Sequence, residues 1–157
     1  MTIRSQELSA NLDSIRARIG AAVQGSGRSP DEVTLIVVTK TFNMDLINPI
    51  LNYGHLDFGE NKVQEAKEKW SNVISSMPNI NLHMIGNLQS NKAKDAVMLF
   101  SYIHTLSSEK LAKILKKNKI IIDNFKNDNN FLFILYTKAK IRPCNTMRTD
   151  GMTYSII

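Results

Sequence analysis

Short apolar segments alternate with longer segments of helical periodicity over the first 117 residues. The clearest apolar segment, residues 33–39, is β-branched and almost continuously hydrophobic, as expected of a parallel strand buried on both faces. Further strands are predicted at 55–58, 81–85 and 101–104, and helices at 8–23, 45–53, 91–99, 107–117 and from Glu60 onward. Alternating strands and helices predict βαβ units, and therefore a parallel α/β sheet or barrel.

The last forty residues have a different character. Six of the seven glycines lie at or before Gly86, whereas residues 118–157 are rich in asparagine. Their two apolar segments, 120–122 and 131–136, share no helical period. We therefore predict two parts: a domain over 1–117, and a tail over 118–157 that is poorly ordered.

The net charge of +6 is divided evenly between these two parts. Residues 1–117 contain 14 basic and 11 acidic residues, and residues 118–157 contain 6 basic and 3 acidic residues. A nucleic-acid-binding protein is an alternative that rests on charge alone, and a binding constant independent of salt would exclude it. Half of the excess positive charge lies in residues 118–157, which do not continue the α/β pattern. We therefore expect no nucleic-acid partner.

Several other classes are disfavoured by the sequence. No apolar run approaches the roughly 18 residues of a membrane span, and Glu7 and Asp13 interrupt any secretory signal, so we expect a cytoplasmic protein without a membrane partner. A single cysteine, Cys144, offers neither an internal disulfide nor a thiolate cluster. Three histidines in predicted strands lack ligands at metal spacing, so we expect core or rim positions and no metal site: His55, His83 and His104.

Lys40 follows the first predicted strand. Ligands in parallel α/β folds bind at the carboxyl ends of the strands. A partly desolvated lysine amine there can form an imine with an aldehyde, and pyridoxal 5'-phosphate (PLP) is the commonest aldehyde cofactor. The alternative is an ordinary lysine whose ammonium group reaches solvent from a strand end.

Two further segments join a predicted strand to a helix. In residues 58–61, Gly59 permits a tight turn and Asn61 could hydrogen-bond a ligand; the alternative is an ordinary helix start, with Glu60 favourable to the helix dipole. In residues 83–92, Ser90 is a good N-cap and Gln89 could reach into a pocket. Capping alone is again the alternative.

Taken in order, these segments resemble the pyridoxal phosphate homeostasis protein (YggS/PROSC) family. The three segments are VVTKT at 37–41, FGENKVQE at 58–65 and HMIGNLQSNK at 83–92. Similarity extends over residues 3–117. Lys62 and Met84 depart from the tyrosine and phenylalanine that are common in the family, and both are expected at a pocket margin.

The resemblance implies the N-terminal portion of a PLP-binding (β/α)8 TIM barrel, similar to the alanine racemase N-terminal domain. A complete barrel needs about 250 residues, so this barrel is expected to be incomplete. The implied function is PLP binding and intracellular vitamin B6 homeostasis, with the cofactor held as a Schiff base on Lys40 beside Asn61 and Ile85. A carrier without turnover is implied, with PLP-dependent apo-enzymes as partners.

The resemblance ends near Lys117. In the family, later strands bring serine, glycine and threonine groups that hold the cofactor phosphate, and an arginine that faces the pyridine nitrogen. Neither has a counterpart in 118–157, where Arg142 and Arg148 lie outside any matching motif, so impaired binding is expected. The alternatives are a PLP-dependent amino-acid racemase-like enzyme and a non-functional truncated product. A half barrel would also leave two open sheet edges, which favours marginal stability or association.

The abrupt change of composition after Lys117 suggests a chain truncated or frameshifted there. If so, another reading frame of the downstream DNA should resume the family pattern. Absence of that pattern from both other frames would contradict the frameshift hypothesis.

Overall fold

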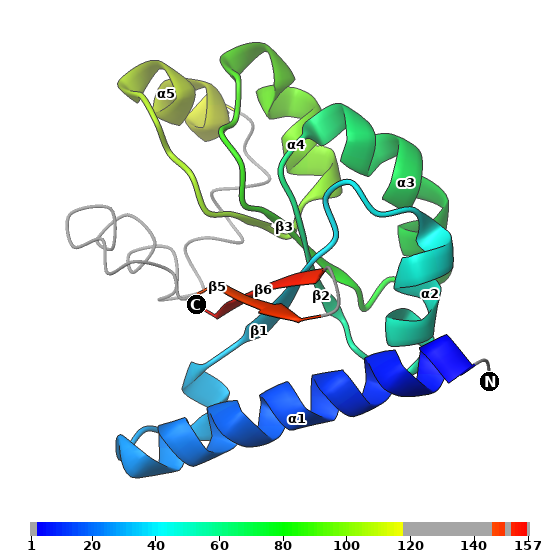
Figure 1. Ribbon diagram of the computed structural model, residues 1–157. Helices are drawn as coiled ribbons and strands as arrows, with labels where there is room; N and C mark the ends of the chain where they lie inside the picture. The colour runs from blue at the N-terminus through cyan, green and yellow to red at the C-terminus, as the bar shows by residue number, and fades with distance from the viewer. Residues whose placement is uncertain (1–2, 118–145, 150–151, 157) are drawn as a thin grey trace.

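The computed structural model describes residues 3–117, 146–149 and 152–156, which form a sheet with helices packed against it (Figure 1). Six strands occur in the order β4-β3-β2-β1-β6-β5. Their bounds are β1 Leu35–Val38, β2 Asp57–Glu60, β3 Asn81–Met84, β4 Tyr102–Ile103, β5 Thr146–Thr149 and β6 Met152–Ile156. The α-helices are α1 Ile3–Gly25, α2 Met44–Asn52, α3 Val63–Ser76, α4 Ala93–Leu99 and α5 Glu109–Lys117.

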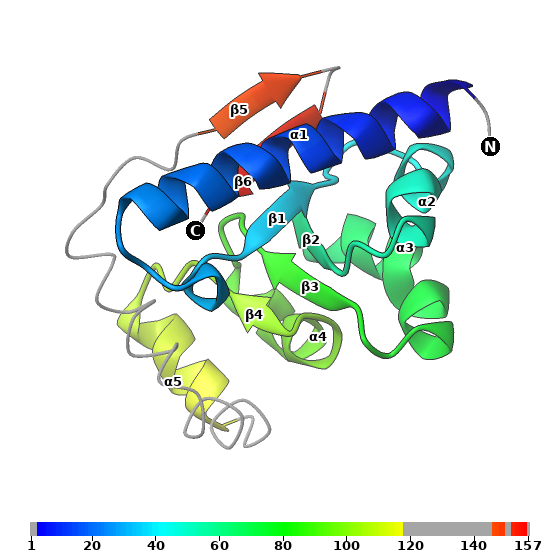
Figure 2. The same ribbon diagram turned by 90° about the horizontal axis from the view of Figure 1, so that it is seen from below.

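Strands β1 to β4 are parallel and lie side by side in chain order (Figure 2). Phe58 of β2 is in register with Val37 of β1 and Leu82 of β3. Helices α2, α3 and α4 connect the successive strands, and α1 precedes β1 and packs against α2. Repeated parallel βαβ units confirm the predicted α/β class and are what the first half of a barrel requires.

Element boundaries differ from prediction mainly at the start of α1, which is Ile3 and not residue 8, and in β2. Its predicted range was 55–58, but the strand begins at Asp57 and includes Gly59 and Glu60. Those last two residues have the composition of a turn, yet Gly59 has parallel partners on β1 and β3, and Glu60 has one on β3. Neighbouring strands therefore override the local preference.

The edge of β1 is occupied by a strand that the sequence did not predict. β6 pairs antiparallel with β1, with Leu35 opposite Ile156 and Val38 opposite Thr153, and β5 completes the hairpin. One of the two edges expected to be open is thus covered. The apolar segments 120–122 and 131–136 lie outside the described residues, and poor order of the tail stays a prediction.

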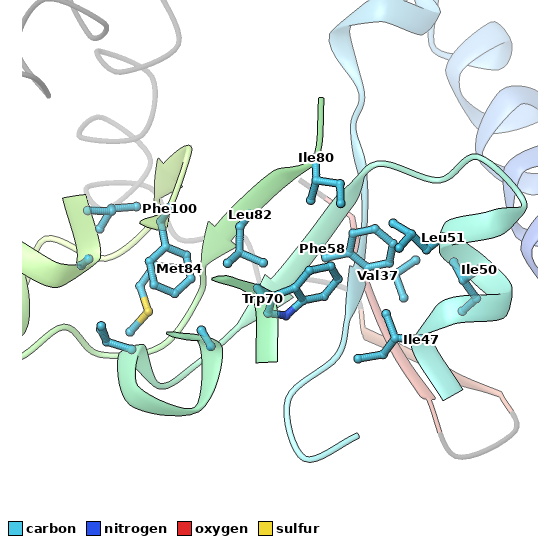
Figure 3. Close-up of a cluster of buried hydrophobic side chains, with 14 of the residues drawn as sticks. Val37, Ile47, Ile50, Leu51, Phe58, Trp70, Ile80, Leu82, Met84 and Phe100 are labelled. Carbon is cyan, nitrogen blue, oxygen red and sulfur yellow. The ribbon is translucent and has the colours of Figure 1, made fainter. Parts of the chain in front are cut away.

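The main core lies between the sheet and its helices (Figure 3). Phe58 and Trp70 are fully buried with ring centroids 4.9 Å apart, and Val37 packs in the same cluster. The helices contribute Ile47 from α2, Trp70 from α3, Ala93 and Ala96 from α4, and Leu111 from α5. Because strand side chains alternate, Ile36 and Val38 are buried on the opposite face, outside this cluster. Within the described residues, the helices are too short or too polar to cross a membrane.

Candidate functional site

Lys40, Asn61 and Ile85, the three predicted cofactor-binding residues, follow three adjacent parallel strands. Each lies one or two residues beyond the end of its strand, β1, β2 or β3. The backbone continues to pair there: the Thr39 N–H donates to the Gly59 carbonyl and the Ile85 N–H donates to the Glu60 carbonyl, both at 2.9 Å. The fold therefore brings the three residues to one edge of the sheet, where a parallel α/β protein binds ligands.

Gly86 lets the loops after β2 and β3 touch. A Cβ atom at this position would lie 2.2 Å from the carbonyl oxygen of Asn61 and 2.7 Å from its Cα. Contacts below 3.0 Å with backbone atoms cannot be relieved by a side-chain rotation. Glycine is therefore required here for Asn61 and Ile85 to lie close together.

We expect Gly86→Ala to separate these loops and weaken PLP binding about fivefold or more. Overpacking against backbone costs about 1–3 kcal/mol, and 1.4 kcal/mol is tenfold in binding. Gly20→Ala is the matched control, because a Cβ at Gly20 in α1 would meet no atom within 4 Å. Equilibrium titration with PLP measures the effect. Equal affinity of the Gly86→Ala variant and the wild type would contradict the role of this contact.

The Asn61 side chain has an unused acceptor at this edge. Its Oδ1 atom is buried and has no hydrogen-bond partner within the described residues. A buried amide oxygen without a donor is costly, so the position suits a ligand that brings one. Ile85 lies nearby over Gly59, where a Cβ would be 3.1 Å from the Ile85 Cδ1 atom.

Lys40 itself is exposed on the turn that follows β1, so the partial desolvation that its strand-end position suggested is not found. No hydrogen bond or ion pair engages its ammonium group within the part of the chain that the structure describes. The next residue, Thr41, has a φ of 68° and donates its N–H to Glu65 Oε1 at 2.8 Å. A free amine on a held turn is what covalent capture of an aldehyde needs.

Glu60 has a structural role that differs from the interaction with a helix dipole suggested by its sequence position. Its carboxylate is fully buried at the end of β2 and does not act as a surface charge at a helix start. One oxygen, Oε1, accepts hydrogen bonds from three side chains: Thr39 Oγ1 at 2.7 Å, Lys69 Nζ at 2.9 Å and Trp70 Nε1 at 3.0 Å. The cluster ties the ends of β1 and β2 to α3, directly beside Lys40.

The structure also shows where three other residues discussed in the sequence analysis lie. Met84 is not at a pocket margin, because its side chain is 1% exposed in the core between sheet and helices. Lys62 is exposed. Gln89 is exposed and takes the cap position before the 3-10 turn Ser90–Lys92, so the expected cap at Ser90 is shifted by one residue.

His83 and His104 form a network with Asp57, whereas the His55 ring packs edge-on against Phe58 of the core. His83 Nε2 lies 3.1 Å from Asp57 Oδ1, and His83 Nδ1 lies 2.9 Å from His104 Nε2. Burial, followed by repulsion from His83, lowers the pKa of His104 to about 4. Burial also lowers the pKa of His55. No group of three metal-ligating side chains occurs among residues 3–117 and the two tail strands.

These shifts predict acid sensitivity. A histidine whose pKa is about 4 when folded and about 6.5 when unfolded binds more protons in the unfolded state between those values. The free energy of unfolding should therefore fall by roughly 2–3 kcal/mol as the pH drops from 6.5 to 4. Urea unfolding at pH 7.0 and about 4.5 measures this, and His104→Phe should reduce the difference. An unchanged pH dependence in that variant would contradict the assignment.

The described residues fit part of PLP. Lys40 could supply an amine for the aldehyde, and Asn61 and Ile85 could supply a polar and an apolar contact at the same edge. No described residue is assigned to the phosphate or to the pyridine nitrogen: Arg142 lies outside the described residues, and Arg148 belongs to β5, on the far side of β6 from β1. The chain therefore presents groups for the ring end of the cofactor.

Comparison with known proteins gives relatives over the first three quarters of the chain. No protein-family model matches the sequence. The chain is 34% identical over 114 residues to the pyridoxal phosphate homeostasis protein of Escherichia coli K12, covering 72% of this chain and 49% of that protein. The protein of the same name from Vibrio cholerae is 34% identical over 116 residues, covering 73% and 49%. The chain thus spans about half the length of the curated relatives it matches.

Solved structures give the same result. PipY of Synechococcus elongatus PCC7942 with PLP bound is similar with a TM-score of 0.53 and 36% identity, over 66% of this chain and 47% of that one. An unknown protein from Bifidobacterium adolescentis has a TM-score of 0.67 and 25% identity, over 78% and 53%. The predicted resemblance to pyridoxal phosphate homeostasis proteins is confirmed over the matched part, together with the fold.

Proposed function

We propose that this chain, as a relative of the pyridoxal phosphate homeostasis proteins, binds PLP through Lys40 and serves intracellular vitamin B6 homeostasis. The observation that carries the proposal is the convergence of Lys40, Asn61 and Ile85 at the carboxyl edge of three parallel strands. The PLP bound to the similar protein PipY supports the same cofactor. When bound, PLP supplies an aldehyde that can form a C=N bond with an amine.

Each residue has a separate part in this proposal. Lys40 would hold the cofactor covalently, because its side-chain nitrogen could condense with the aldehyde to give a C=N bond and one water. Asn61 Oδ1 would accept a hydrogen bond from the bound molecule, which would give this buried oxygen the donor that the described residues do not supply. Ile85 covers apolar surface, and Gly59 leaves it room.

Binding is proposed to depend little on the cofactor phosphate. The chain matches about half the length of its relatives, and its described residues offer the phosphate no assigned partner. Backbone N–H groups and helix ends usually supply much of the affinity for phosphates. The test is titration with PLP and with pyridoxal, which lacks the phosphate; we expect affinities within about tenfold of each other. A much larger preference for PLP would show that this chain holds the phosphate.

The chain is proposed to act as a carrier in the cytoplasm, with PLP-dependent apo-enzymes as recipients. The relatives are named for homeostasis, which supports a role without turnover. Mixing the PLP-loaded chain with an apo-transaminase should restore its activity, and incubation with L-alanine should yield no D-alanine. Racemisation above the rate of PLP alone would favour the racemase-like alternative.

A further inference from the structure

The turn that carries Lys40 is strained. Thr41 is the one non-glycine residue in the described part of the chain with a positive φ, 68°. Threonine is β-branched, so the left-handed conformation is unfavourable for it and persists only where surrounding contacts hold it. Such positions concentrate at functional sites, so the contacts that hold Thr41 matter.

Both peptide units beside Lys40 are tied to α3. On one side, Glu65 Oε1 accepts the Thr41 N–H at 2.8 Å. On the other side, Lys69 Nζ donates to the Thr39 carbonyl at 2.9 Å. Lys69 also lies 3.5 Å from Glu65 Oε1, so the two ties are linked.

The carboxylate of Glu65 is suited to this role. The hydrogen bond from the Thr41 N–H, followed by the nearby Lys69 charge, lowers the pKa of Glu65, which stays ionised at neutral pH. A charge-assisted hydrogen bond is about twice as strong as a neutral one. Glu65 is 30% exposed and shares Lys69 with the buried Glu60 carboxylate. Glu60 keeps Lys69 and its hydrogen bonds from Thr39 and Trp70 when Glu65 is lost, so that loss should spare the core.

We propose that Glu65, supported by Lys69, is a positioning residue that holds the strained turn so that the Lys40 amine meets the cofactor aldehyde. This inference rests on the proposed function. Glu65 differs from a purely structural residue in this proposal. Its hydrogen bond restrains the turn and does not contribute to the packing of the sheet and helices.

Glu65→Ala, Glu65→Gln and the control Glu68→Ala test the proposal. Glu68 lies on the same helix, is exposed, and pairs with Gln64. Two quantities are measured: the PLP concentration that gives half-maximal borohydride-trapped Lys40, and hydrogen exchange of the Thr41 amide in the unloaded protein. We expect about a tenfold rise in that concentration for Glu65→Ala, with faster exchange, and roughly threefold for Glu65→Gln, which keeps a neutral acceptor. Glu68→Ala should match the wild type.

The outcomes separate the two proposals. Wild-type protein without a Lys40 adduct would overturn the proposed function, and this inference with it. A wild-type adduct whose half-maximal concentration is unchanged in Glu65→Ala would overturn the inference alone, as would unchanged Thr41 exchange. If Glu65→Ala fails to fold, Glu65→Gln decides between the same results.

Discussion

Replacing Lys40 by arginine should abolish covalent attachment of PLP while leaving the fold intact. Arginine keeps the positive charge, but its guanidinium stays protonated and cannot form the C=N bond. Lys40 is exposed, and its ammonium group has no ion pair within the described residues, so the stability change should stay within about 0.5 kcal/mol. We expect roughly a hundredfold less borohydride-trapped adduct, or none, because the reacting amine is absent.

The matched control for this prediction is Lys62→Arg. Lys62 is exposed on the neighbouring loop, next to Asn61, and should be dispensable. Intact-mass measurement after reduction compares the two variants with the wild type. An adduct that persists in Lys40→Arg and disappears in Lys62→Arg would show that PLP attaches to Lys62, which would contradict the prediction.

The second large effect concerns stability. Lys69→Met should lower the free energy of unfolding by about 3–5 kcal/mol, because it leaves the buried Glu60 carboxylate without its cation. The two side chains are 9% and 0% exposed and lie 2.9 Å apart, so water cannot replace the lost partner. Urea unfolding measures the change.

Two comparisons test that explanation. Lys67→Met removes a surface ion pair to Asp95 whose side chains are 55% and 42% exposed, so it should cost less than about 1 kcal/mol. Adding Glu60→Gln to Lys69→Met removes the uncompensated charge and should recover part of the loss. Equal stability of Lys67→Met and Lys69→Met would contradict a buried pair at this position.

Local patterns predicted most of the fold. Helical periodicity located α2, α4 and α5 within about two residues and the start of α3 within three, whereas α1 begins five residues before its predicted start. The predicted range of β2 was two residues too early, because Gly59 and Glu60 have local turn preferences. Its position depends on β1 and β3, which lie more than twenty residues away on either side.

The candidate site was predictable in outline only. Strand-end position and the family motifs identified Lys40, and the structure brings Asn61 and Ile85 to the same edge. The supporting contacts were not predicted, since Thr41 and Glu65 are 24 residues apart and Thr39 and Glu60 are 21 apart. Such pairs follow no helical or strand period, and only the folded chain brings them together.

Peptide mass mapping of the wild-type chain tests the central claim most directly. The protein is incubated with less than one equivalent of PLP, reduced with borohydride and digested. We predict that the modification is concentrated on the peptide that contains Lys40. Modification spread evenly over the exposed lysines, or concentrated on a different one, would contradict PLP binding at this site.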